Sequence, residues 1–151
     1  MNRREFIAAT GTVCIGCGGT GCMSTITSDE NRIRLLGVTV SNVDTKPHTF
    51  HVLVREDDEI VHWSTHRIES SSDTEYGSTE VKKTWSDEAA RFKVSGRVDR
   101  SSTWKTTDFD GQDKCAAAKF QVEKNGEFQL MGPLTCEDAS TIYNKTDNSP
   151  D

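Results

Sequence analysis

Short segments in which apolar and polar residues alternate run through the middle of this chain, and turn-forming residues separate them. Residues 49–55, 60–65 and 91–99 are clear examples. A period of two places the apolar side chains on one face of a β-strand, and the 3.6-residue period of an amphipathic helix is almost absent. About eight such segments at regular spacing predict an all-β fold, an immunoglobulin-like antiparallel β-sandwich, with a closed barrel as the alternative.

The clearest predicted hairpin joins residues 49–55 to residues 60–65 around Asp57-Asp58. A connecting loop of even length keeps the apolar residues of both strands on one face. The facing pairs are then Val54 with Val61, Val52 with Trp63, and Phe50 with Thr65.

The register of the last predicted hairpin follows from its apolar residues. A two-residue loop made of Asn125 and Gly126 would divide these residues between two faces. A three-residue loop over residues 124–126, with Gly126 in the left-handed conformation, pairs Val122 with Phe128 and keeps one face apolar. We therefore predict the three-residue loop.

Two cysteines, Cys115 and Cys136, flank this last hairpin. In the predicted register Cys115 faces Thr135, and one extra residue at Gly132-Pro133 brings Cys136 opposite instead. Two thiols that flank one hairpin in an exported domain predict a disulfide, and two free buried thiols are the alternative. The disulfide would close a loop of about 20 residues and contribute roughly 3 kcal/mol.

The N-terminal residues 1–22 have the layout of an export signal with a lipobox. A basic start with Arg3 and Arg4 precedes an uncharged, weakly apolar stretch and small residues before Cys22. The paired arginines resemble a twin-arginine signal, which exports folded proteins. The small residues before Cys22 resemble a lipobox, and Cys17 is a competing lipidation site. We expect a lipid on Cys22 to hold the protein at the extracellular face of the cell membrane.

Composition divides the remaining chain into three parts. Residues 23–31 form a polar linker, residues 32–136 form the β-sandwich domain, and residues 137–151 are expected to be a disordered polar tail. Asn144 begins an Asn-Lys-Thr glycosylation sequon within that tail. The formal net charge of −6 argues against a nucleic-acid partner.

Histidines are the first candidate for a chemical site. In the predicted first hairpin His51, His62 and His66 share the face opposite Trp63, and His51 is diagonal to the other two. Diagonal neighbours are about 7–8 Å apart, which lets two imidazoles share a zinc or copper ion. The alternative is a polar outer face in which histidine is simply solvated.

Carboxylates around Gly111 are the second candidate. Asp108, Asp110 and Asp113 resemble half of a calcium-binding loop, because oxygen ligands converge on a turn that glycine permits. The bidentate glutamate that ends an EF-hand loop does not follow. An acidic turn on an acidic protein is therefore the favoured interpretation.

Motifs of enzyme catalysis do not occur in the sequence. We find no nucleophile elbow, no phosphate-binding loop and no dinucleotide-binding glycine pattern. The sequence therefore predicts a protein that is not an enzyme and that carries no cofactor.

Several of these features together resemble a group of small haloarchaeal proteins with twin-arginine signals, which are lipoproteins of unknown function. The resemblance rests on Arg3-Arg4-Glu5-Phe6 with Cys22, residues 47–54 followed by Val61-His62-Trp63-Ser64, Trp85 before Phe92, and Cys115 before Gly126. It implies an exported β-sandwich adapted to high salt, which screens acidic self-repulsion. We expect an interaction or structural module with an unknown surface protein as partner. The alternative is a metal carrier or sensor that uses the outer-face histidines.

Overall fold

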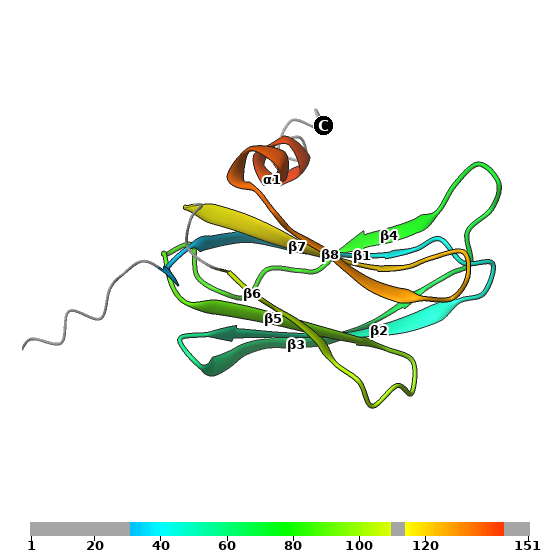
Figure 1. Ribbon diagram of the computed structural model, residues 1–151, viewed down its shortest axis with the longest axis horizontal. Helices are drawn as coiled ribbons and strands as arrows, with labels where there is room; N and C mark the ends of the chain where they lie inside the picture. Colours follow the sequence, from blue (N-terminus) through cyan, green and yellow to red (C-terminus); the bar gives the residue numbers. More distant parts are fainter. Residues whose placement is uncertain (1–30, 110–113, 144–151) are drawn as a thin grey trace, which may run out of the picture.

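The computed structural model describes residues 31–109 and 114–143. Its elements are β1 (Arg34–Asn42), β2 (His48–Glu56), β3 (Glu59–Ile68), β4 (Gly77–Glu80), β5 (Phe92–Val98), β6 (Lys105–Asp108), β7 (Cys115–Val122), β8 (Phe128–Leu134) and α1 (Cys136–Tyr143). The strands form two four-stranded sheets, ordered β4-β1-β7-β8 and β3-β2-β5-β6. The two sheets lie face to face, with α1 outside the first sheet (Figure 1). The predicted all-β sandwich is confirmed.

Phenylalanine rings fill the space between the sheets near the β7–β8 hairpin. The rings of Phe120 and Phe128 stack with centroids 5.7 Å apart, and Phe50 of the opposite sheet lies 6.2 Å from Phe128. Gly96 in β5 lies under the Phe120 ring, where a β-carbon would come within 2.7 Å of ring atoms. The two sheets therefore meet closely at a position that only glycine fits.

One strand pairing departs from the antiparallel sandwich that the sequence predicts. The first strand, β1, runs parallel to β7 and antiparallel to β4. A parallel pair needs a long connection. Here the connection from β1 to β7 contains all four strands of the second sheet. In the other sheet, the hairpin β2–β3 lies beside the hairpin β5–β6, in the order β3-β2-β5-β6. One sheet of immunoglobulin variable domains has the same order of two adjacent hairpins.

The last hairpin has the predicted register. Val122 faces Phe128, and Gly126 has a φ of 78°, which a left-handed loop residue requires. One residue of β7 lies between Ala117 and Lys119, whereas two residues of β8 lie between their partners Leu134 and Met131, so β8 carries the expected bulge. Its extra residue falls at Gly132-Pro133, as predicted.

The bulge brings the two cysteines of the hairpin together. Cys115 and Cys136 form a disulfide, and their Cα atoms lie 4.8 Å apart. Because Cys136 is the first residue of α1, the bond also fixes the start of the helix to β7.

The helix α1 corrects the prediction that a disordered tail begins at residue 137. Thr135 caps the helix, since its hydroxyl accepts a hydrogen bond from the Asp138 amide at 3.3 Å and donates one to the Asp138 carboxylate at 2.9 Å. Ala139 is fully buried, and the Tyr143 ring packs on Gly37, with its hydroxyl 2.7 Å from the Thr39 hydroxyl. The Thr135 cap and the close packing of Tyr143 on Gly37 stabilise this helix. The polar composition of residues 137–143 does not show these contacts, and it predicted a disordered tail. Residues 144–151, including Asn144, lie outside the described residues.

The first hairpin has the predicted even loop but not the predicted register. Asp57 and Asp58 form a two-residue turn with φ values of 46° and 71°, the geometry that suits the twist of a hairpin. Arg55 faces Ile60, whereas Val54 faces His62, so Val61 is an extra, bulged residue. Beyond this bulge every side chain of β3 points to the face opposite from the prediction.

Candidate functional site

The bulge at Val61 separates the three histidines that the sequence placed on one face. His62 and His66 point inward, on the side of Val54 and Phe50, whereas His51 points outward. A zinc or copper site shared by His51 with His62 or His66 is therefore wrong. In residues 31–109 and 114–143, no group of three or more His, Cys, Asp or Glu side chains is arranged to hold a metal ion.

The two inward histidines are linked through a serine. The Ser64 hydroxyl oxygen lies 2.7 Å from Nε2 of His62 and 2.7 Å from Nε2 of His66. Nδ1 of His62 lies 2.7 Å from the Thr84 hydroxyl, which donates to the Val61 carbonyl at 3.0 Å. Because the Thr84 proton goes to that carbonyl, the neutral His62 ring donates from Nδ1 and accepts at Nε2. Ser64 then donates to His62 and accepts from His66, so the chain of hydrogen bonds has one direction.

Burial favours the neutral form of both of these imidazoles. It lowers the pKa of His62, and the nearby His66 lowers it further; burial also lowers the pKa of His66. Trp85, whose indole donates to the Leu35 carbonyl at 2.8 Å, meets the His62 ring edge-on at 5.6 Å. Both ring nitrogens of His62 are therefore bonded within the fold. The chain of hydrogen bonds holds the edge strand β3 to the segment that contains Thr84.

His48 forms a second polar contact, between two loops. Its Nδ1 lies 2.7 Å from the Asp99 carboxylate and its Nε2 lies 2.9 Å from the Asp44 carboxylate. Burial lowers the pKa of His48, but hydrogen bonds to Asp44 and Asp99 and their negative charges outweigh that effect and raise it overall. The same contact with His48 lowers the pKa of Asp44. The charged histidine thus joins the loop after β1 to the loop after β5.

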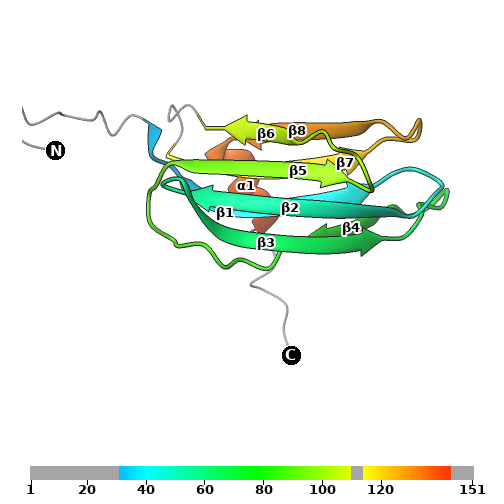
Figure 2. The ribbon, with the colours of Figure 1, turned by 90° about the horizontal axis from the view of Figure 1, so that it is seen from below.

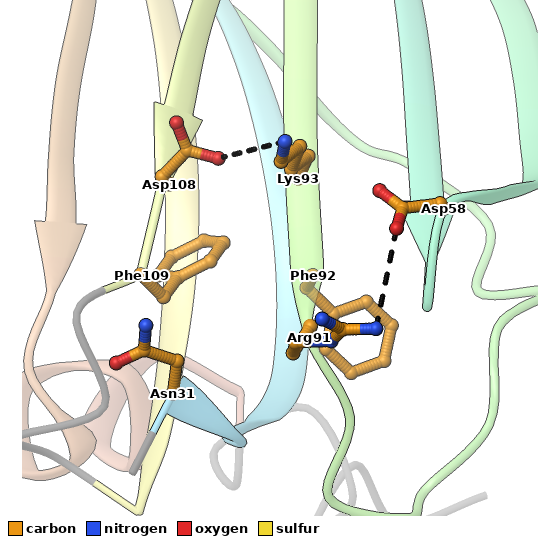
Figure 3. A pocket seen from close by; sticks show the side chains of 7 residues that line it. All are labelled: Asn31, Asp58, Arg91, Phe92, Lys93, Asp108 and Phe109. Carbon is orange, nitrogen blue, oxygen red and sulfur yellow. Dashed lines mark ion pairs between the residues drawn. The ribbon is translucent and has the colours of Figure 1, made fainter. Parts of the chain in front are cut away.

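Asp108, the described member of the predicted calcium site, lies at the end of β6 and forms an ion pair with Lys93 at 3.9 Å. Asp110 and Asp113 lie outside the described residues. Asp108 lines a cavity of about 310 Å³ that Figure 3 shows from close by.

The charges around this cavity are already matched. Lys93 faces Asp108, and Arg91 lies 4.0 Å from the Asp58 carboxylate on the other side (Figure 3). The buried rings of Phe92 and Phe109 also line the cavity. Each cation has a carboxylate partner, so the cavity offers no excess of either charge to a ligand.

The outward side of the β3-β2-β5-β6 sheet is named here the outer face. No described segment lies over it, whereas α1 covers part of the other sheet (Figures 1 and 2). Trp63 lies on this face and is 64% exposed, the greatest exposed fraction of any large apolar side chain described. Its outward position follows from the bulge at Val61, and the sequence analysis missed it. The adjacent apolar pair Ile60-Val61, which breaks the alternation, is the signal that could have indicated the bulge.

A row without charged groups crosses the outer face from β3 to β6. The strand registers place Trp63 beside Leu53, Leu53 beside Ser95, and Ser95 beside Thr106. Three strand spacings of about 4.8 Å make this row roughly 14 Å long. The hydroxyls of Ser95 and Thr106 lie 2.8 Å apart, so their hydrogen bond holds the far end of the row.

Cations lie on both sides of the uncharged row. On one side Arg55 faces Lys93; on the other side the cation is Arg97. The Arg97 guanidinium lies 5.1 Å above the ring of Trp104, which precedes β6. This face is therefore basic and aromatic on a chain whose formal net charge is −6.

The predicted anchor and signal, Arg3, Arg4 and Cys22, lie outside the described residues. Within the ranges 31–109 and 114–143, no helix is both long and apolar enough to span a membrane.

Comparisons with known proteins assign the chain to no family. No family model matches the chain, and no curated protein matches it. Among solved structures, a protein from Eubacterium rectale determined by NMR matches with 15% sequence identity and a TM-score of 0.35, covering 74% of this chain and 97% of the other. The resemblance to haloarchaeal lipoproteins stays a prediction.

Proposed function

We propose that this protein is an exported, lipid-anchored, non-enzymatic β-sandwich that binds other material at the extracellular face of the cell membrane, and that its outer face is the binding surface. Export rests on the signal in residues 1–22, and anchoring rests on Cys22. The disulfide between Cys115 and Cys136 supports export, because such bonds persist in oxidising compartments outside the cytosol.

The exposure of Trp63 is the observation that carries the proposed binding surface. A tryptophan at 64% exposure keeps a large apolar ring in water, and tryptophan and arginine are both enriched at binding hot spots. Arg55 and Arg97 lie within two strands of it on the same face. An exposed indole beside cations is typical of an interaction surface, and it is less expected on a polar face that contacts only water.

Co-sedimentation with cell envelopes tests the proposed function. The full chain, purified in detergent, is mixed with envelopes of the native host from which lipid has been extracted, so that the anchor itself cannot insert. We expect the chain to sediment with the envelopes and Trp63→Ala to reduce the bound fraction strongly. Tyr76→Ala is the matched control, because Tyr76 is 58% exposed but lies against Lys119 of the other sheet.

Two results would overturn this proposal. One is a wild-type chain that stays in the supernatant with extracted envelopes. The other is equal sedimentation of wild type, Trp63→Ala and Tyr76→Ala. Mass spectrometry of the membrane fraction tests the anchor separately, since a mature N-terminus beyond Cys22 without lipid would exclude it.

A further inference from the structure

We propose that the outer face binds an acidic polysaccharide, laid across the strands along the uncharged row that begins at Trp63. This inference rests on the proposed function, because it names the class of material that the outer face would bind. Three features of the face carry it: the uncharged row across the strands, the cations on both sides of it, and the aromatic rings at opposite edges of the face.

The row is shaped for a linear chain. It runs from β3 across β2 and β5 to β6, roughly 14 Å, and its members Leu53, Ser95 and Thr106 are small or nearly buried. Only Trp63 stands far out of it. A narrow and uncharged track fits an extended polymer better than the surface of a folded protein, which needs complementary shape over a broad patch.

The cations are placed for groups that project to both sides of such a polymer. Side chains two residues apart on a strand are about 7 Å apart, so Arg55 and Lys93 line one side of the row and Arg97 lines the other at about that distance. Arginine forks bind carboxylate or sulfate groups through two parallel hydrogen bonds. Asp108 is the single carboxylate among these rows, and Lys93 pairs with it.

Aromatic rings lie at opposite edges of the same face. The exposed indole of Trp63 on β3 offers a flat apolar surface for the C–H face of a sugar ring. At the other edge the guanidinium of Arg97 holds the Trp104 ring, 5.1 Å from its centroid. A ring at each edge of the face and cations beside the uncharged row suit an acidic glycan, because the rings offer apolar surface to sugar rings and the cations bind acidic groups.

Binding of defined polymers to the full chain tests the inference. Polygalacturonate serves as the acidic polysaccharide, dextran as the neutral polysaccharide, and polyglutamate as the acidic peptide. Isothermal titration calorimetry at low and high salt measures each affinity. We expect polygalacturonate to bind, dextran to bind much more weakly, and added salt to weaken the polygalacturonate complex, because it screens exposed charges.

Variants separate stacking from simple charge attraction. Trp63→Ala is expected to weaken polygalacturonate binding by about 30-fold, and Arg55→Gln by about tenfold. The controls Tyr76→Ala and Lys82→Gln change an exposed aromatic ring and an exposed cation away from the outer face, and they should leave the affinity unchanged. Circular dichroism of each variant verifies that it is folded, which is expected for changes at exposed side chains.

The outcomes distinguish this inference from the proposed function. Polyglutamate that binds as tightly as polygalacturonate, with no loss in Trp63→Ala, would overturn the inference in favour of charge attraction alone. The inference would also be overturned if polygalacturonate does not bind while the envelopes do. In that case, Trp63→Ala and protease treatment of the envelopes would each abolish envelope binding. The proposed function would then stand, with a protein as the partner.

Discussion

Histidine side chains of this protein lie in two settings that shift their pKa values in opposite directions. His48 lies between the carboxylates of Asp44 and Asp99, and its pKa is raised. His62 and His66 are partly buried without a carboxylate partner, and their pKa values are lowered. The two sites therefore contribute to the free energy of unfolding with opposite dependence on pH.

We predict that His48→Ala destabilises the protein more in acid than in base. A raised folded-state pKa means that the contribution of His48 is fully present below the ordinary value of about 6.5 and is lost as the pH rises through the folded-state pKa. Charged hydrogen bonds of this kind are worth about 1–3 kcal/mol. Urea unfolding at about pH 5.5 and about pH 9 measures the difference between wild type and variant. A loss of the same size at both pH values would contradict the prediction.

We predict that His66→Gln makes stability less dependent on pH below neutrality. Since the folded state holds the pKa of His66 low, the unfolded chain binds the proton first, and stability falls as the pH drops below about 6.5. Glutamine still offers a donor to Ser64 but does not titrate. Unfolding between about pH 7.5 and about pH 5 should therefore give a shallower loss in the variant. His51→Gln is the control, since His51 lies on the outer face, bonded to Thr65 at 3.0 Å.

At the scale of strands, the two hairpins show how much of the register can be read from sequence. In the β7–β8 hairpin, a two-residue loop would place Val122 and Phe128 on different faces, whereas the three-residue loop places them on one face. The apolar residues therefore identify the three-residue loop. In β3, both faces carry amphipathic side chains, with His62 on one and Trp63 on the other. Alternation cannot choose between such faces, and one bulged residue reverses them. The fold class was therefore predictable, whereas the composition of the outer face was not.

Gly96 is the strand position most sensitive to a small change. A β-carbon there would lie 2.7 Å from the Phe120 ring, which is fully buried and packed against Phe128. We predict that Gly96→Ala costs about 1–3 kcal/mol through overpacking, measured by urea unfolding. Ser95→Ala, one residue away on the outer face, is the matched control and should change stability by less than about 1 kcal/mol. Equal effects of the two substitutions would refute the prediction.

At the scale of the whole molecule, the disulfide joins the last strand pair to the helix. Cys115 and Cys136 are 21 residues apart in the chain. We predict that the double variant Cys115→Ser and Cys136→Ser loses about 3 kcal/mol of stability, chiefly because its unfolded chain is less constrained. Urea unfolding of the variant, beside wild type with and without a reductant, measures the loss. A variant as stable as the oxidised wild type would argue against a stabilising bond.

The pairing of distant strands was the part of the architecture that local patterns could not indicate. Each predicted hairpin joins neighbouring segments, whose register follows from facing residues. The parallel contact of β1 with β7 depends on how the whole sandwich closes. The consecutive buried residues Ala116, Ala117 and Ala118 mark a strand covered on both faces, but they do not say by what. The elements are therefore more predictable from the sequence than their arrangement in the two sheets.

The parallel pairing of β1 with β7 has a consequence for how the protein is made. The first strand of the domain to leave the ribosome, β1, is flanked in its sheet by β4 and by β7, which is synthesised about 80 residues later. Such distant contacts slow folding, because the intervening chain must be closed into a loop before they form. The first sheet cannot close until nearly all of the domain has been translated. A translocon that threads the nascent chain would receive this domain unfolded. The paired arginines Arg3-Arg4 predict a different route, which exports folded domains. That route suits a protein in which the first strand pairs with one of the last.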